Sequence, residues 1–253
     1  MRSIFKILLV VSIVAGVLVC SGNVYTVKKP KQGIREVQAK TIIEQLNKGN
    51  HLYLDSCIVW GDLDFTTLNN RNRIAANLTQ IFVNQSITFT NCVFINKIKA
   101  FDGAKGLCME FAHNLSFTGC DFRSEVDFSE SIVHGHAFFT GSTFRAVTKM
   151  QGAHFRHKKT YFTETKFEEE ALFQNAVFTG DAHFLHAIFS ADAMFQKVIV
   201  GGLLFFGDAR FDGYADFTYA YAFESIFRYA QFNGRYDFDY SRLNTDSLTI
   251  LNP

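Results

Sequence analysis

Histidine and carboxylate side chains are the residues of this chain that could perform acid–base or metal chemistry. Six of the eight histidines fall within 53 residues: His134, His136, His154, His157, His183 and His186. Imidazoles bind transition metals, but no two of these have i, i+4 spacing and no carboxylate triad accompanies them. The chain has no P-loop, no Gly-x-Ser-x-Gly, no His-Glu-x-x-His and no dinucleotide fingerprint. We therefore expect no catalytic residue, no metal ion and no cofactor.

Tyrosine is a second candidate, because interfaces between proteins favour its ring and hydroxyl group. Six of the nine tyrosines lie in the 27 residues that begin at Tyr214. We expect Tyr214, Tyr219, Tyr229 and Tyr240 to contribute to a partner surface. The alternative is that this part of the chain only widens to hold larger side chains.

The charge balance argues against two classes of nucleic-acid-related protein. Lys and Arg number 25 and Asp and Glu number 24 in 253 residues, which gives a formal net charge of +1. A non-specific nucleic-acid binder needs a basic excess, and an acidic DNA mimic needs the opposite. The apolar content of 48% is too high for a disordered chain.

The first residues are typical of a targeting segment, and we assign residues 1–22 as a signal peptide or membrane anchor. Arg2 and Lys6 precede an apolar run over residues 7–19, and small residues follow it. Three interpretations stay open, in this order: a signal cleaved after Gly22, an uncleaved anchor over residues 4–20, and a lipoprotein acylated at Cys20. Each predicts an extracytosolic chain that is secreted, periplasmic or anchored facing outward, and only the uncleaved segment would hold it in a membrane.

Residues 23–50 are expected to hold a linker over 23–33 and a short capping helix over about 35–48. Ala39, Ile42, Ile43 and Leu46 have i, i+3, i+4, i+7 spacing, and Gly49 suits the end of a helix.

The spacing of phenylalanine is the main signal for the fold. Large apolar residues recur after alternating steps of five and six residues, as in Phe117, Phe122, Phe128, Val133, Phe139 and Phe144. A small residue stands two positions before most of them. Neither a helix nor an ordinary strand has this period, whereas repeated units that turn a corner mark a solenoid. Of the 29 phenylalanines, 23 fall on the predicted central positions, and Phe5, Phe82, Phe101, Phe111, Phe138 and Phe205 do not.

The units resemble those of the pentapeptide-repeat family, whose consensus is Ala-(Asp/Asn)-Leu-x-x. Residues 182–186 (Ala-His-Phe-Leu-His) and 187–191 (Ala-Ile-Phe-Ser-Ala) show the pattern with Phe in place of the central Leu, as in a Phe-rich branch of that family. The resemblance implies an all-β solenoid over residues 51–249, a right-handed quadrilateral parallel β-helix of about eight coils. We name its four faces A to D, with Phe117 on A, Phe122 on B, Phe128 on C and Val133 on D.

Two segments interrupt the repeat on the D side of adjacent coils, at residues 66–86 and 101–114. Loops carry function more often than regular scaffolds do, so Arg71 and Arg73 in the first segment are further candidates for a partner surface. The alternative is a packed elaboration without a function of its own. Towards the C-terminus, Phe223, Phe227, Phe232, Phe238 and Leu243 are expected to continue the core with irregular steps.

Cys57, Cys92 and Cys120 share one position of face B in three successive coils, so we expect them to stack as a column. They serve there as small buried residues, and a disulfide between two of them is the alternative in an oxidising compartment.

These observations favour an exported, non-catalytic scaffold that mediates protein–protein interaction or has a structural role, with an unknown protein partner or a homodimer through the C-terminal coils. No nucleic-acid partner is expected. The alternatives are a carbohydrate-binding or carbohydrate-active β-helix, which exposed Tyr and Asp side chains would suit, and a DNA-mimicking topoisomerase inhibitor, a role that the resemblance implies for some members of the family.

Overall fold

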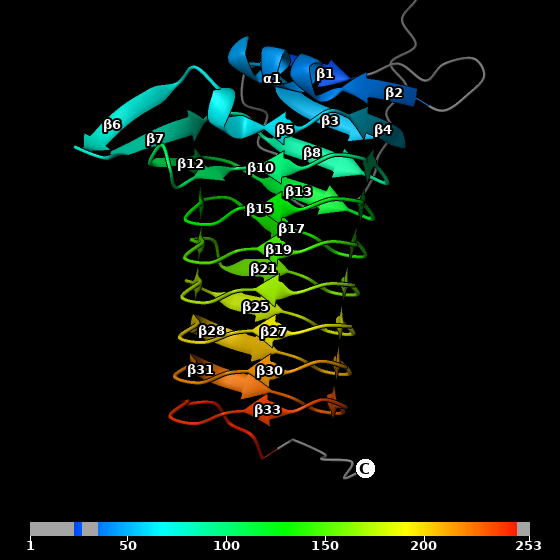
Figure 1. Ribbon diagram of the computed structural model, residues 1–253, viewed down its shortest axis with the longest axis vertical. Helices are drawn as coiled ribbons and strands as arrows, with labels where there is room; N and C mark the ends of the chain where they lie inside the picture. Colours follow the sequence, from blue (N-terminus) through cyan, green and yellow to red (C-terminus); the bar gives the residue numbers. More distant parts are fainter. Residues whose placement is uncertain (1–22, 27–34, 247–253) are drawn as a thin grey trace, which may run out of the picture.

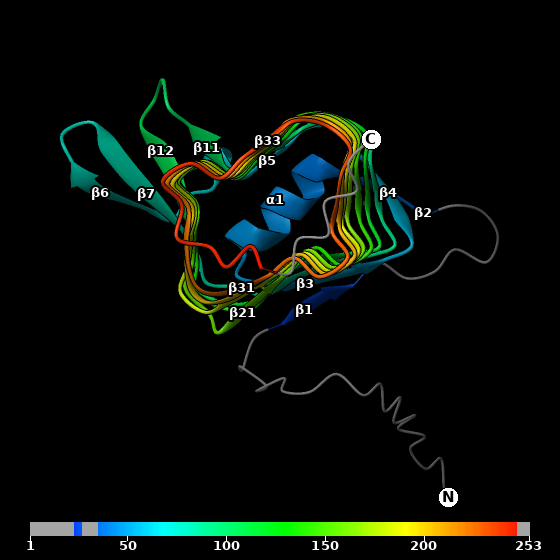
Figure 2. The same ribbon diagram turned by 90° about the horizontal axis from the view of Figure 1, so that it is seen from below.

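The computed structural model describes residues 23–26 and 35–246 and shows a parallel β-helix with its long axis vertical in Figure 1. Seen from its C-terminal end, the chain runs counterclockwise around a four-sided coil while it approaches the viewer, so the helix is right-handed (Figure 2). Residues 51–246 form eight coils, and paired residues in neighbouring coils lie 22 positions apart at most steps, as at Asp121 and Thr143. The predicted fold is confirmed.

Face A carries the first strand of each coil. Its strands are β1 (Val24–Thr26), β3 (His51–Asp55), β8 (Ile87–Thr90), β13 (Leu115–Thr118), β17 (Ala137–Phe138), β21 (Lys159–Tyr161), β25 (Asp181–His183) and the C-terminal parts of β28 (Ile199–Phe205) and β31 (Tyr221–Ile226). The N-terminal parts of β28 and β31 lie on face D. Faces A and D therefore belong to one 16-stranded sheet.

Face B is a nine-stranded sheet and face C an eight-stranded one. Face B consists of β2 (Arg35–Gln38), β4 (Cys57–Trp60), β9 (Val93–Phe94), β14 (Asp121–Phe122), β18 (Thr143–Phe144), β22 (Lys166–Phe167), β26 (Ile188–Phe189), β29 (Arg210–Phe211) and β32 (Gln231–Phe232). Face C consists of β5 (Leu63–Asp64), β10 (Ile98–Lys99), β15 (Val126–Asp127), β19 (Thr148–Lys149), β23 (Ala171–Leu172), β27 (Ala193–Met194), β30 (Ala215–Asp216) and β33 (Tyr236–Asp237). A short 3₁₀ helix, η1 (Phe65–Thr67), follows β5.

The core consists of phenylalanine rings stacked from coil to coil. The Phe184 ring lies between those of Phe162 and Phe206, with ring centroids 4.9 and 4.8 Å apart and planes within 16°. The small residues that precede the rings by two positions, such as Ala182 and Ala187, are also fully buried. The central residue of each unit and the small residue two positions before it therefore both point inward, as the spacing predicts.

Helix α1 (Ala39–Asn47) lies across the N-terminal end of the coil interior (Figure 2). Its four predicted apolar residues are buried, but it begins four residues later than expected. Residues 35–38 extend face B instead, because all four pair with residues 57–60 of β4. Residues 24–26, which the sequence places in a linker, form β1 against β3.

The two predicted interruptions project from one corner of the coil (Figure 2). The first forms the antiparallel hairpin of β6 (Arg71–Ala75) and β7 (Leu78–Val83), and the second pairs β11 (Phe101–Asp102) with β12 (Leu107–Phe111). The later residues of both segments rejoin face D, where β12 runs parallel to β7 and to β16 (Ile132–Val133). Face D continues through β20 (His154–Phe155) and β24 (Val177–Phe178).

Two phenylalanines differ from the expected arrangement. Phe111 is buried on face D, where its ring lies 5.5 Å from that of Phe65 and helps to fill the interior beside the small Ala100. Phe223 is wrongly predicted as core, because Ala222 pairs with Val200 and takes the inward position. The register between β28 and β31 shifts after Val200, so the six-residue step from face D to face A shortens to five.

Candidate interaction surface

Three tyrosines occupy corners of the last coils at which the backbone is left-handed. The φ angles of Tyr219, Tyr229 and Tyr240 are +59°, +60° and +58°. Three of the equivalent corners in earlier coils hold Gly119, Gly141 and Gly152. The others hold mostly small or charged residues. Positive φ is unusual for a bulky side chain and costs about 1–2 kcal/mol relative to the right-handed region. At these corners the phenol rings therefore stand outward at a conformational cost.

Tyr219 and Tyr240 stack on each other, one coil apart, with ring centroids 5.0 Å apart and planes at 9°. Both follow face C by the same number of residues, which is the arrangement that the spacing predicts. The facing sides of the two rings are already in contact, so their edges and the outer side of Tyr240 are left for a partner. A flat sugar-stacking platform would need several free ring faces, which this column does not offer.

An apolar patch lies next to this column on face D of the last coils. Ile199 pairs with Tyr221 on the outer side of the sheet, and Phe223 follows two residues later. Their exposed fractions are 47%, 40% and 77%, beside 56% for Tyr219 and 76% for Tyr240. We name these five residues the C-terminal apolar surface. Exposed apolar groups that lie together mark interaction sites more often than single ones do.

The sequence prediction for this surface is incomplete. It includes Tyr219 and Tyr240 but misses Ile199, and it assigns Phe223 to the core. Tyr221 stands two positions before Phe223 and points outward, because Ala222 takes the inward position. The regular five-residue step from Phe217 to Ala222, which pairs with Val200, is the signal that could have found them.

The other predicted tyrosines lie around the same end of the β-helix. Tyr229 is exposed, and the guanidinium of Arg228 lies 4.8 Å from its ring centroid. Tyr214 is half-buried, with the Arg235 guanidinium 5.4 Å from its ring centroid. Its backbone N–H donates to Asp192 in the preceding coil. Tyr214 is thus a less accessible member of the predicted group.

Arg71 and Arg73 lie at the opposite end of the rod from the tyrosines, on β6 of the projecting hairpin (Figure 1). Arg71 donates from Nε to the carbonyl oxygen of Leu68 at 2.9 Å and from Nη2 to that of Thr66 at 2.7 Å. Arg73 donates to the carbonyl oxygens of Ala75 and Ala76. The six predicted residues therefore form two separate surfaces, and both guanidinium groups also hold the hairpin in shape.

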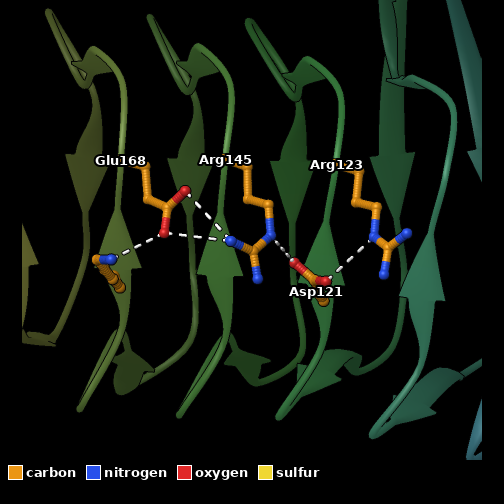
Figure 3. Close-up of polar contacts among 5 residues, drawn as sticks. Asp121, Arg123, Arg145 and Glu168 are labelled. Atoms are coloured by element: carbon orange, nitrogen blue, oxygen red, sulfur yellow. Dashed lines mark hydrogen bonds and ion pairs between the residues drawn. The ribbon is translucent and has the colours of Figure 1, made fainter.

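Face B carries a ladder of five charged side chains across three coils (Figure 3). Arg145 donates to Asp121 at 2.6 Å and to Glu168 at 3.3 Å, while Lys166 donates to Glu168 and Arg123 to Asp121. Lys166 and Arg145 lower the pKa of Glu168, and Asp121 raises that of Arg145. Such exposed pairs stabilise a fold only weakly. Because each carboxylate here is paired with a base, this face lacks the uncompensated acidic character of a DNA mimic.

Histidines and aromatic rings line the outside of face A near its corner with face D. The His136 and His157 rings lie 3.6 Å apart by centroid, and neither buried Nδ1 atom has a hydrogen-bond partner. Burial, and then the neighbouring His157, lower the pKa of His136. Phe138, one of the exceptions to the core pattern, stacks on Tyr161 in an outward column. Within residues 23–26 and 35–246, no group of three or more His, Cys, Asp or Glu side chains is placed to hold a metal ion.

Cys57, Cys92 and Cys120 stack on face B as the register predicts. The Sγ atoms of Cys57 and Cys92 lie 3.2 Å apart, and all three thiols are free. The hydrogen bond with Cys92 and burial raise the pKa of Cys57, and burial raises that of Cys120. Ser142 continues the column and donates to the carbonyl oxygen of Phe117 at 2.8 Å, so a small polar residue also fits.

A right-handed parallel β-helix built from five- and six-residue steps defines a class of solenoid repeat proteins. Residues 150–199 match the family model described as pentapeptide repeats (9 copies). Over these residues the chain is similar to the pentapeptide-repeat family, and the family resemblance seen in its phenylalanine spacing is confirmed. No curated protein and no solved structure matches it.

The comparison and the fold together make the chain a repeat scaffold. The proposed targeting segment, residues 1–22, lies outside the described residues. Among the residues that are described, no helix is long and apolar enough to cross a membrane.

Proposed function

We propose that this protein is an exported, non-catalytic scaffold that binds a protein partner through its C-terminal apolar surface. The observation that carries the proposal is the exposure of Tyr219, Tyr221, Phe223 and Tyr240 together on the last coils. A solvated corner would be served by glycine or asparagine. Large rings at left-handed positions cost stability, and contact with a partner would compensate for that cost.

A second copy of the chain is the partner that we propose. Helix α1 covers the N-terminal end of the coil interior, whereas among the described strands none follows β32 and β33 at the other end. Phe232 and Phe238 of the last coil are only partly buried. Solenoid ends need a cap, and two such ends placed together would cover each other. The C-terminal apolar surface borders this end and would enlarge the contact.

Export is the other part of the proposal and rests on the basic start and apolar run of residues 1–22. Intact mass and cell fractionation of the native protein test it. A start near Asn23 outside the cytosol supports a cleaved signal, and an intact Met1 in the membrane fraction supports an anchor. An intact chain in the soluble cytosol would refute export and favour a cytosolic role.

The dimer is tested by the molar mass of the full mature chain across a concentration series. We expect a dimer for the natural chain and a monomer for the double variant Phe223→Ser/Tyr240→Ser. Tyr53→Ser is the matched control, because Tyr53 is half exposed but lies on face A of the first coil. A monomeric natural chain, or a dimer that survives the double variant unchanged, would contradict the proposal. Far-ultraviolet circular dichroism shows whether each variant is folded.

A further inference from the structure

Strand β6 is the edge of the 16-stranded sheet and leaves one side open. Its one neighbour among the described strands is β7, and all five of its residues are exposed. The hairpin projects away from the rod, so no part of the described β-helix covers it (Figures 1 and 2). A sheet edge of this kind can accept a further strand from another polypeptide.

The backbone pairing indicates which groups of β6 face outward. Phe82 donates its backbone N–H to the carbonyl oxygen of Asn70 at 2.8 Å, and Asn72 pairs with Gln80 two residues further along. In an antiparallel pair, alternate residues exchange hydrogen bonds and the residues between them turn away. The N–H and C=O groups of Arg71 and Arg73 therefore point to the open edge, where a new strand would bond.

The positive charge of the hairpin indicates which kind of partner strand would bind it. Residues 66–86 contain Arg71 and Arg73 and no Asp or Glu. The two arginines share one face of β6, since side chains alternate along a strand. The exposed Ile74 follows at the point where the pairing of β6 with β7 becomes irregular. A second copy paired antiparallel about Asn72 would set Arg71 opposite Arg73, and like charges placed opposite each other repel.

We propose that β6 binds an extended segment of another protein, by strand addition, in which acidic residues alternate with apolar ones. The carboxylates would meet Arg71 and Arg73, and the apolar side chains would lie on the opposite face of the extended sheet. The inference rests on the proposed function as an interaction scaffold, but it uses the end of the rod opposite to the proposed dimer contact. Either proposal can therefore fail without the other.

A synthetic peptide of four Glu-Val repeats with blocked ends is the probe, and its binding to the full mature chain is followed by fluorescence anisotropy. A Lys-Val peptide of equal length and a Glu-Val peptide N-methylated at alternate residues are the controls. We expect both controls to bind at least tenfold more weakly. Amide exchange at Arg71 and Arg73 should slow when the Glu-Val peptide is bound. Failure to bind at 1 mM, or equal binding of the two charge types, would overturn the inference.

Two variants distinguish the contribution of the arginine charge to binding from that of the backbone groups at the edge of β6. Arg73→Glu should reverse the preference, so that the Lys-Val peptide binds more tightly than the Glu-Val peptide. Arg73→Pro removes an outward N–H and should weaken binding of both. Arg235→Glu, at the other end of the rod, should change nothing. Amide exchange over the rest of the β-helix shows that each variant is folded, and an unchanged preference in Arg73→Glu would refute the proposed site.

Discussion

At the scale of single residues, the backbone conformation at the corners from face A to B and from face C to D affects the stability of the fold. Most of these corners hold one residue at positive φ, and eleven of them are not glycine. Lys197 is such a residue, exposed and with φ at +56°. Gly152 holds the equivalent place two coils earlier, and a Cβ atom there would lie 2.2 Å from Glu130 Oε1.

We predict opposite effects for substitutions at these two corners. Lys197→Gly should leave the free energy of unfolding unchanged or raise it by up to about 1 kcal/mol, because relief of the left-handed backbone outweighs the greater freedom of glycine in the unfolded chain. Gly152→Ala should lower it by about 1 kcal/mol through the strain of a left-handed backbone, since the exposed Glu130 side chain can move away from the new Cβ atom. Urea unfolding measures both. A clear loss of stability in Lys197→Gly would contradict the conformational explanation.

Two partly buried histidines predict how stability depends on pH. Burial lowers the pKa of His136 and of His183 in the folded chain, although Asp181 opposes the shift at His183. The unfolded chain takes up these protons near pH 6.5, so between this value and the lower folded pKa it binds more protons than the folded chain does. Stability is therefore complete above about pH 6.5 and falls as the pH decreases.

Urea unfolding at pH 7.5 and 5.5 tests this sign. The natural chain should be less stable at the lower pH, and the His136→Gln variant should lose less stability over the same interval. His154→Gln is the control, because His154 is exposed on face D. Equal losses in all three proteins would show that His136 does not carry the effect.

At the scale of elements, helix α1 closes an end that would otherwise expose the interior. Ile42 of this helix is fully buried, whereas Lys40 of the same helix is exposed. Ile42→Ala should lower the free energy of unfolding by about 2–5 kcal/mol, since the end of the rod cannot easily collapse onto the space left behind. Thermal and urea unfolding check this, with Lys40→Ala as the control. A loss no larger than that of the control would mean that α1 is not a cap.

The sequence predicts regular elements better than interrupted ones, for a physical reason. A five- or six-residue step repeated through many coils places Phe184 and Cys92 reliably, because each position is supported by the same position in its neighbours. Strand β2 and the start of α1 lie outside the repeat, where apolar spacing alone does not show that residues 35–38 pair with β4. The hairpin of β6 and β7 was located as an interruption, but its pairing depends on contacts within the insertion.

The regularity of the repeat also explains which residues of the C-terminal apolar surface could be predicted. Tyr219 and Tyr240 could be predicted as neighbours because they hold equivalent positions in consecutive coils. Tyr221 and Phe223 could not, because Phe223 is the larger apolar residue but its small neighbour Ala222 pairs with Val200 and points inward, so the residues on either side of Ala222 face outward. Ile199 pairs with Tyr221 and faces the same side. A phenylalanine in an otherwise Phe-filled core is therefore misassigned when a small residue next to it takes the inward position.

At the scale of the whole molecule, stability comes from interfaces between consecutive coils. Phe184 has ring neighbours on both sides, whereas Phe238 in the last coil stacks on Phe217 alone among the face C rings, 4.9 Å away. Phe184→Ala should lower the free energy of unfolding by about 3–5 kcal/mol, and Phe238→Ala by less than half as much. Urea unfolding of the two variants compares them directly. A larger loss at Phe238 would show that the last coil, and not the middle of the rod, limits stability.

The coil repeat also has a kinetic consequence. Most sheet hydrogen bonds join residues about 22 positions apart, as between the N–H of Phe139 and the carbonyl oxygen of Tyr161, which is a small fraction of 253 residues. All-β sandwiches and barrels fold slowly because their strands pair over long sequence separations, whereas chains with short separations fold fast. The relative contact order that follows is about 0.09, which is nearer to that of helical bundles than to that of β sandwiches and barrels. Each coil can close on the one before it as the chain leaves the ribosome, without waiting for the C-terminus.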